Sequence, residues 1–151
     1  MDRQQLEQVV RGAVEAVLGK ASTETPVTVA DTRGASTAKV VLVKGTEVGL
    51  KPFAPVPGVD SRLADYVTSA HGAAMAAGLM EIRDSAFDWT LNYEEIDYVL
   101  EGTLDIVVGD QTYRGYKGDA IFIPKGTSIK FSSPDRALFF YVTFPADWAN
   151  Q

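Results

Sequence analysis

The feature that most limits the fold of this chain is a series of short apolar segments between about Ala38 and Phe144. Each has the length and the valine, isoleucine or aromatic content of a β-strand, and turn signals such as Gly109-Asp110 separate them. Many short strands at such spacing are typical of a β-sandwich or a β-barrel, and periodicity alone does not choose between the two. The predicted strands are 39–44, a short one at Val48 and Leu50, 73–83, 87–91, 96–101, 104–108, 111–116, 120–123, 128–131 and 137–144.

The stretch from Pro52 to Gly72 is less regular than the segments around it. Pro52, Pro55 and Pro57 exclude a central strand there, because proline has no backbone N–H to donate to a neighbouring strand. Such a stretch could cover the mouth of a barrel, or it could be a surface connection.

A helical pattern occupies the start of the chain. Asp2 can cap a helix, apolar residues then recur three and four positions apart, and Gly19 is a plausible stop. We therefore predict a short amphipathic helix over residues 1–20, a linker over 21–36, which is small and polar, and one β domain over 37–151. The apolar positions of the predicted helix are Leu6, Val9, Val10, Ala13, Val14 and Val17.

The composition excludes several classes of function. The net charge of -6, with no basic stripe, argues against a nucleic-acid partner. The chain has no cysteine, which excludes disulfides and thiolate sites and fits a reducing, cytoplasmic setting. No apolar run approaches the roughly 20 residues that cross a bilayer, and Glu7, Gln8 and Arg11 interrupt any signal-peptide pattern. We therefore expect a cytoplasmic protein without a nucleic-acid or membrane partner.

Two spacings in the second half of the chain identify a fold family. Glu95, six residues and Gly102 match the end of the first cupin motif, and Gly118, five residues, Pro124, one residue and Gly126 match the start of the second. The chain therefore resembles the cupin superfamily. The blocks WTLNYEEIDYVLEG, IFIPKGTSIKF and YVTFPADW, within a likeness over roughly residues 38–149, resemble the cupin domain of the EutQ family of ethanolamine-utilisation proteins. The resemblance implies an all-β cupin (jelly-roll) barrel after the short N-terminal helix, and a homodimer, as cupins commonly form.

The histidines that cupin motifs use to bind a metal are absent from this sequence. Glu95 occupies the glutamate position, but one carboxylate cannot hold a transition metal alone. The only histidine, His71, lies outside both motifs, and we expect it to face solvent. No tightly bound transition metal is expected, and the resemblance does not extend to metal-dependent dioxygenases. The positions that correspond to the histidines hold Leu91 or Thr90, Trp89 or Asp88, and Ile129.

The candidate catalytic residues are Glu95 and Asp97. They lie two apart on a predicted strand, so their side chains share a face, while Ile96, Tyr98 and Leu100 share the other. If Glu95 points into the barrel, as its motif position implies, Asp97 does as well. Two carboxyls in a partly dry cavity raise the pKa of one of them, which places an acid beside a base. The alternative is that backbone amides or a lysine satisfy both carboxylates.

Four further residues are candidate substrate-binding groups. Trp89 is expected to form a wall of the pocket. Asn92 and Tyr93 can offer an amide and a phenol to a ligand, or can fix the bend before Glu95. Lys125, between Pro124 and Gly126, can meet an anion at the barrel mouth or stay solvated.

The EutQ resemblance implies a reaction and a setting. Proteins like EutQ are associated with acetate kinase activity, the transfer of a phosphoryl group from acetyl phosphate to ADP. Mg²⁺ held through water by Glu95 and Asp97, with Lys125 near the phosphates of ATP or ADP, would serve it. The sequence has neither a P-loop nor a dinucleotide glycine fingerprint.

The same resemblance places the protein in a bacterial microcompartment. The N-terminal helix is similar to encapsulation peptides, so Leu6, Val10, Val14 and Val17 would bind shell proteins. Alternatively, these residues contact the protein's own barrel or a dimer partner. A second function also stays open, a non-catalytic assembly or cargo-docking factor.

Overall fold

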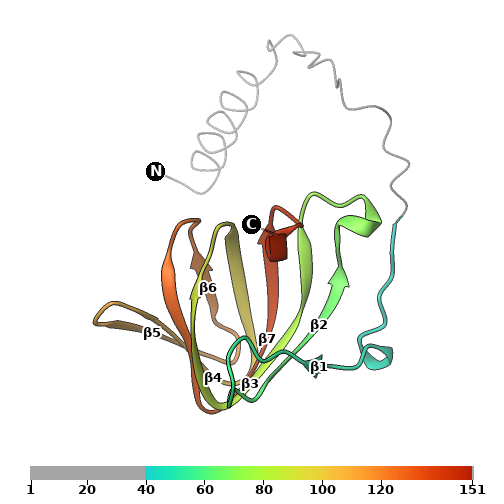
Figure 1. Ribbon diagram of the computed structural model, residues 1–151. Coiled ribbons are helices and arrows are strands. Elements are labelled where there is room, and N and C mark those ends of the chain that lie inside the picture. Colours follow the sequence, from blue (N-terminus) through green and yellow to red (C-terminus); the bar gives the residue numbers. More distant parts are fainter. Residues whose placement is uncertain (1–39, 151) are drawn as a thin grey trace, which may run out of the picture. The chain divides into compact units, whose positions relative to one another are not determined.

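The computed structural model describes residues 40–150, and within this range the chain forms one antiparallel sheet with three short 3-10 helices (Figure 1). The order of neighbouring strands is β1-β2-β3-β7-β4-β5, and β6 pairs with β4. The predicted helix (1–20) and linker (21–36) lie outside the described residues. The elements are η2 (Gly45–Glu47), β1 (Lys51–Pro52), β2 (Ser61–Val67), η3 (Ser69–His71), β3 (Ala76–Thr90), β4 (Glu94–Val108), β5 (Gln111–Tyr116), β6 (Ala120–Ile123), β7 (Ser128–Phe144) and η4 (Trp148–Asn150).

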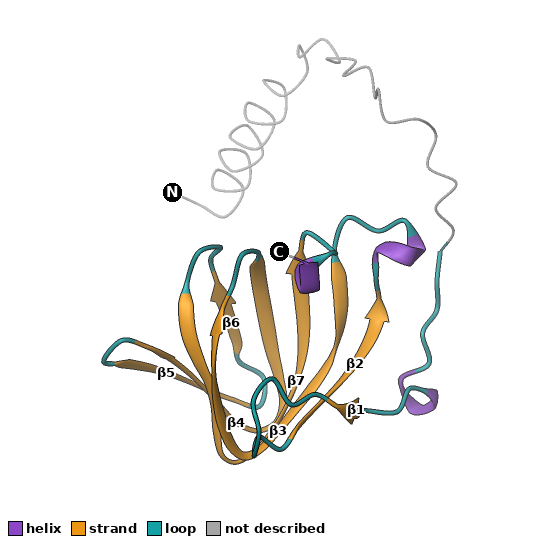
Figure 2. Cartoon of the chain, in the orientation of Figure 1, coloured by secondary structure: helices purple, strands orange, loops and turns teal. Residues whose placement is uncertain are grey.

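Three long strands give the sheet its curvature. β7 lies between β3 and β4, and the register of its pairing shifts between Arg83 and Ser85 of β3 and between Gly102 and Asp105 of β4. These irregularities bend the strands, so the two halves of the sheet wrap around a shared interior (Figure 2). The all-β prediction is confirmed, but each pair of short predicted strands, 73–83 with 87–91, 96–101 with 104–108 and 128–131 with 137–144, is one long strand.

Two predictions for the first described residues are wrong. Residues 40–44 and the positions around Val48 and Leu50 are not in strands, although they are rich in valine. A strand needs a neighbour to complete its hydrogen bonds, and no sheet edge of the described chain pairs with these residues. The prediction of no strand between Pro52 and Gly72 is also too strong, because β2 occupies part of that stretch and pairs with both β1 and β3. Pro52 itself lies in β1, at the edge of the sheet, where proline is tolerated.

Alternate residues of the long strands form the core. Along β7, Ile129, Phe131, Phe139 and Tyr141 are buried while their neighbours are more exposed, which is the two-residue period of a strand with one face inward. Each large apolar side chain buried in this way stabilises the fold by about 1.5–3 kcal/mol. The core also contains Met80, Ile82, Phe87, Leu91, Tyr93, Val99, Leu104, Ile106, Ile123 and Ala137.

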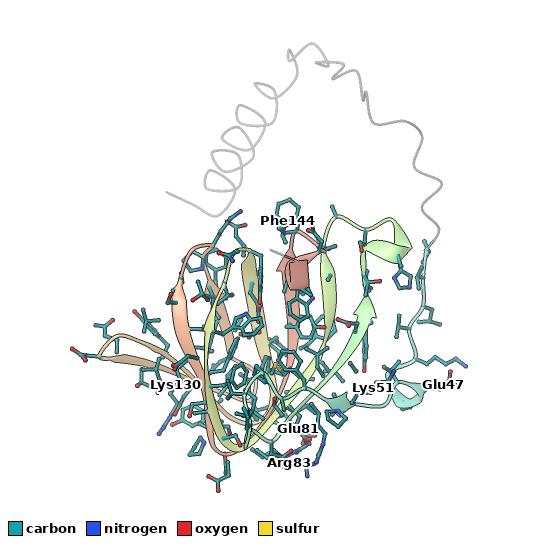
Figure 3. All side chains as sticks on the ribbon, in the orientation of Figure 1. Glu47, Lys51, Glu81, Arg83, Lys130 and Phe144 are labelled. Carbon is teal, nitrogen blue, oxygen red and sulfur yellow. The ribbon has the colours of Figure 1, made fainter. Side chains whose placement is uncertain are left out.

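A buried ionic network joins three strands at one end of the barrel. Glu81 of β3 is 2% exposed, and its carboxylate binds Arg83 at 2.9 Å, Arg136 at 2.7 Å and Arg62 at 3.1 Å. Burial would raise the pKa of Glu81, but Arg83 and Arg136 outweigh it and the pKa lies below its usual value. Figure 3 shows Glu81 and Arg83 at the end of the barrel opposite to Phe144. The network therefore has a structural role at that end of the barrel, where it holds three strands together.

Candidate functional site

The acid pair lies on the inner face of β4, as the strand period predicts. Glu95 is 6% exposed and Asp97 is 0% exposed, whereas Ile96 and Tyr98, which alternate with them, are 47% and 45% exposed. The strand is fixed on both sides, because Glu95 pairs with Ile123 of β6 and with Thr143 of β7. The paired neighbours hold both carboxyls inside the barrel.

Glu95 faces a small cavity with mostly aromatic walls. Its volume is about 20 Å³, which is room for roughly one water molecule. Among the described residues, Glu95 is the only carboxylate in the lining, and no lysine or arginine contributes to it. The lining residues are Phe53, Leu63, Met80, Phe87, Trp89, Tyr93, Glu95, Phe131, Tyr141, Thr143 and Trp148.

Trp148 forms part of the cavity wall. Its ring centroid lies 6.0 Å from that of Tyr93, 6.4 Å from those of Tyr141 and Phe53, and 6.5 Å from that of Trp89. Three of these pairs have the edge-to-face geometry that aromatic rings favour. The indole N–H of Trp89 donates to the hydroxyl of Tyr93 at 2.7 Å, which fixes a second wall. The walls are therefore mainly interlocked rings.

Three oxygen atoms at this site have no hydrogen-bond partner among the described residues. They are both carboxylate oxygens of Asp97 and the hydroxyl oxygen of Thr143, which is 1% exposed. Leaving a buried polar group unpaired costs about 1–3 kcal/mol, so such groups call for an explanation. A proton shared between the two carboxyls would supply one hydrogen bond, and a bound ligand or cation would supply others.

Burial changes the ionisation of the acid pair. It raises the pKa of Glu95 from 4.5 to about 7. Burial, followed by the negative charge of Glu95, raises the pKa of Asp97 well above its usual value. Burial and the charge of Glu95 also raise the pKa of Tyr93. Near neutral pH the pair therefore retains at least one proton, and an acid stands beside a base.

The structure brings together only some of the predicted site residues. Trp89, Tyr93 and Glu95 line the cavity, with Asp97 next to them on the same strand face. Asn92 and Lys125 are exposed and do not line it. They lie on two adjacent turns, because the N–H of Leu91 donates to the carbonyl of Thr127 at 3.0 Å and the N–H of Gly126 donates to that of Leu91 at 2.7 Å. Leu6, Val10, Val14 and Val17 lie outside the described residues.

Several residues of the site were not predicted from the sequence. Tyr141 and Thr143 alternate with Phe139 along the last strand, so their shared inward face could have been read from the period of two. Phe53 and Trp148 gave no such signal. They reach the cavity from a loop and from η4, and local periodicity does not predict how such segments fold back.

The donor atoms of the site suit a hard cation better than a transition metal. Among the described residues, no group of three or more histidine, cysteine or acidic side chains could hold a metal ion. The exposed His71 instead accepts a hydrogen bond from the backbone N–H of Thr68 at 3.1 Å. Carboxylates with a hydroxyl oxygen are the ligands that Mg²⁺ prefers, with water completing its shell. Glu95, Asp97 and Thr143 therefore fit Mg²⁺ in kind, although the cavity of about 20 Å³ is too small for a nucleotide.

In the described part of the chain, no helix is long and apolar enough to cross a membrane.

Comparison with known proteins identifies close relatives. A sequence model of the family "Ethanolamine utilisation protein EutQ" matches residues 1–150. The chain is 52% identical over 87 residues to the acetate kinase EutQ of Clostridioides difficile (strain 630), which covers 58% of this chain and 55% of that protein. It is 48% identical over 88 residues to the acetate kinase EutQ of Salmonella typhimurium, which covers 58% of this chain and 38% of that protein. The match thus spans about half, or less, of the length of these relatives.

Solved structures show the same fold. The EutQ protein of Clostridium difficile has a TM-score of 0.61 at 48% identity, covering 64% of this chain and 70% of that one. A putative ethanolamine utilisation protein from Salmonella typhimurium LT2 has a TM-score of 0.67 at 42% identity, covering 70% and 85%. The cupin domain of Schizosaccharomyces pombe Cnp3 has a TM-score of 0.57 at 16% identity, covering 74% of this chain and 79% of that one. This similarity concerns the fold alone. The predicted cupin fold is confirmed, and the chain belongs to the EutQ family of ethanolamine utilisation proteins.

Proposed function

We propose that the protein acts in ethanolamine utilisation as an acetate kinase, transferring a phosphoryl group between acetyl phosphate and ADP to give acetate and ATP. The observation that carries this proposal is the 52% and 48% identity to two relatives that are named acetate kinases. The cavity has room for roughly one water molecule, so an acetyl group would enter it only if one wall moved.

In this proposal Glu95 and Asp97 would hold Mg²⁺ through water, with Thr143 as a third oxygen donor. The ion, when bound, would neutralise negative charge on the phosphates. Tyr93 and Trp89 would enclose the acetyl group and exclude water. The nucleotide would lie outside the cavity, where Lys125 and Asn92 project from the two adjacent turns.

Alanine variants of the acid pair test the proposal. We expect Glu95→Ala and Asp97→Ala to lower Mg²⁺-dependent ATP formation by at least about 100-fold, because each removes an oxygen ligand of the proposed ion. Glu94→Ala is the matched control, since Glu94 precedes Glu95 on the same strand but is exposed. Circular dichroism would check that the variants are folded. Full activity in either variant would contradict the assigned roles. A wild-type protein that neither binds ADP with Mg²⁺ nor forms ATP would favour the non-catalytic assembly factor.

We also propose that the protein works inside a bacterial microcompartment, where residues Leu6, Val10, Val14 and Val17 bind shell proteins. Charged variants Val10→Asp and Val14→Asp should reduce the fraction of protein recovered with purified shells. Gln8→Asp, on the polar side of the same pattern, should not. Equal recovery of all variants would favour the alternative, in which these residues contact the barrel or a dimer partner.

A homodimer is the third part of the proposal. Its support is an apolar patch on the outer face of β4, β6 and β7, where Ile96, Tyr98, Phe122 and Phe144 are 45–59% exposed. Ile96 pairs with Phe122 across two strands, so these side chains are adjacent. A patch of neighbouring exposed apolar side chains marks an interaction surface, and a second copy presents the same surface.

A further inference from the structure

We propose that the cavity beside the acid pair binds a small organic ammonium cation, held by carboxylate oxygens and surrounded by aromatic rings, with Trp148 as a movable wall. This inference goes beyond the proposed kinase function, because it assigns a second ligand to the same carboxylates. A ligand of this kind would compete with the proposed Mg²⁺.

The charge of the site selects a cation. Both carboxylate oxygens of Asp97 are fully buried and lack a partner among the described residues. Within residues 40–150, Glu95 is the only carboxylate that lines the cavity, and no lysine or arginine of this range lines it. A buried carboxylate without a counter-ion is costly, and a positively charged ligand removes that cost. An anionic ligand would add to it.

The walls select an organic cation. The rings of Phe53, Trp89, Tyr93, Tyr141 and Trp148 all line the cavity. The centroid of the Trp148 ring lies 6.0–6.5 Å from those of the other four. Aromatic faces within about 6 Å attract ammonium groups and also accept carbon substituents. Mg²⁺ keeps its water shell and gains little from such walls. An aromatic enclosure with a carboxylate at its base is therefore better suited to an alkylammonium ion than to a bare metal ion.

The unpartnered hydroxyl of Thr143 adds a further requirement for the chemistry of the ligand. It lines the cavity, is 1% exposed and has no hydrogen-bond partner among the described residues. A ligand that carries a hydroxyl group near its ammonium group could bind the carboxylate of Glu95 and the hydroxyl of Thr143 together. Ethanolamine in its protonated form has this chemistry, and the family that matches the chain is described by ethanolamine utilisation.

Entry requires one wall to move, since the cavity of about 20 Å³ holds roughly one water molecule. Trp148 belongs to η4, which has three residues and follows β7 near the C-terminal end of the described chain (Figure 1). Its ring is only half-buried, unlike the core residues. Tyr93, Phe87 and Tyr141 are 3% exposed. Phe53 and Trp89 are half-buried as well, but the backbone N–H of Phe53 donates to the carbonyl of Ser61 and Trp89 lies within β3, so Trp148 is the wall that can leave at the lowest cost. After ligand entry it would close over the ammonium group.

Fluorescence of Trp148 tests the proposal directly. The chain has two tryptophans, so Trp89→Phe leaves Trp148 as the only one. Titration of this variant with ethanolamine at pH 7.5 should give a saturable change in emission, and calorimetry on the unmodified chain should give binding of the same ligand. Ethylene glycol and acetate, which match ethanolamine in the number of non-hydrogen atoms but are neutral and anionic, should bind at least ten-fold more weakly.

Two variants test the proposed contact between the ligand and Glu95. Glu95→Gln keeps the shape of the side chain without its charge and should weaken ethanolamine binding at least ten-fold, whereas Glu94→Gln should not change it. Circular dichroism would confirm that both are folded. If Glu95→Gln does not fold, the comparison of the three ligands on the unmodified chain decides alone.

Each outcome has a distinct meaning. Equal binding of ethylene glycol and ethanolamine would overturn the inference, because charge would not be recognised. Binding of acetate in place of ethanolamine would also overturn it and would favour the kinase proposal. Ethanolamine binding in a protein without kinase activity would support the inference and contradict the proposed function, so the two can fail separately.

Discussion

At the residue scale, the acid pair combines burial with an unmet need for hydrogen bonds. Glu95 and Asp97 lie on one inner strand face, where water cannot solvate both charges. A strand of alternating residues supplies this placement without any special backbone geometry. The same pair could hold a proton, a metal ion or an organic cation, and each of these would relieve the repulsion between the two carboxylates.

The first prediction concerns stability as a function of pH. Since burial raises the pKa of Glu95 from 4.5 to about 7, the folded state binds this proton more tightly than the unfolded state does. The free energy of unfolding should therefore fall as pH rises from about 4.5 through about 7, by roughly 1–3 kcal/mol from this carboxyl. Glu95→Gln should flatten that decline and be more stable than the unmodified protein at pH 8. Urea denaturation at pH 5 and pH 8 measures both effects.

Glu94→Gln serves as the control in these experiments, because Glu94 is exposed on the same strand. It should keep the pH dependence of the unmodified protein. An unchanged pH dependence in Glu95→Gln would show that Glu95 is not the group that titrates.

At the scale of elements, the sequence predicts those structural features that depend on residues close together along the chain. The inward direction of Glu95 and Asp97 follows from the two-residue period of β4, and the structure agrees. Residues 40–44 have the composition of a strand but lack one, because strand formation depends on a neighbouring edge that composition does not reveal. The closure of the cavity by Phe53 and Trp148 also joins distant parts of the chain, so no local pattern could predict it.

Gly102 shows how a motif residue controls the geometry of an element. Its φ is 74°, in the left-handed region, and a Cβ atom there would lie 1.6 Å from the carbonyl oxygen of Arg136. Gly102 lies where the register between β4 and β7 shifts, so it permits the close approach that bends β4. The glycine that ends the first cupin motif thus meets a steric requirement here.

The second prediction follows from this contact. Gly102→Ala should destabilise the protein by roughly 2–5 kcal/mol, since it combines backbone strain with a clash that only a backbone shift can relieve. Gly118→Ala is the matched control, because φ of Gly118 is 97° but nothing lies within 4 Å of the added Cβ. It should cost about 1–2 kcal/mol. Thermal denaturation compares the two variants, and equal melting temperatures would contradict the steric explanation.

At the scale of the whole molecule, the inner and outer faces of the sheet have different tasks. The inner face holds the core, the cavity and the acid pair, whereas the outer face of β4, β6 and β7 carries the exposed apolar patch. The ionic network of Glu81 joins β2, β3 and β7 at the end of the barrel opposite to Phe144 (Figure 3). This division would leave the cavity free to bind a small ligand while the outer face contacts the proposed second copy.

The third prediction tests that second copy. Tyr98→Glu and Phe122→Glu place charges in the apolar patch and should convert the proposed dimer to a monomer in sedimentation experiments. Tyr113→Glu, at a residue of β5 that is 51% exposed and outside the patch, should leave the dimer intact. A dimer that persists in both patch variants would show that the interface lies elsewhere on the molecule.

Carbon NMR can follow the titration of the carboxyl groups of Glu95 and Asp97, with each signal assigned by the Glu95→Gln and Asp97→Asn variants. Glu95 should titrate near pH 7 and Asp97 well above its ordinary range, and ethanolamine should shift both titrations to lower pH. Two carboxyls that titrate below pH 5, with or without the ligand, would contradict a buried and unpartnered acid pair.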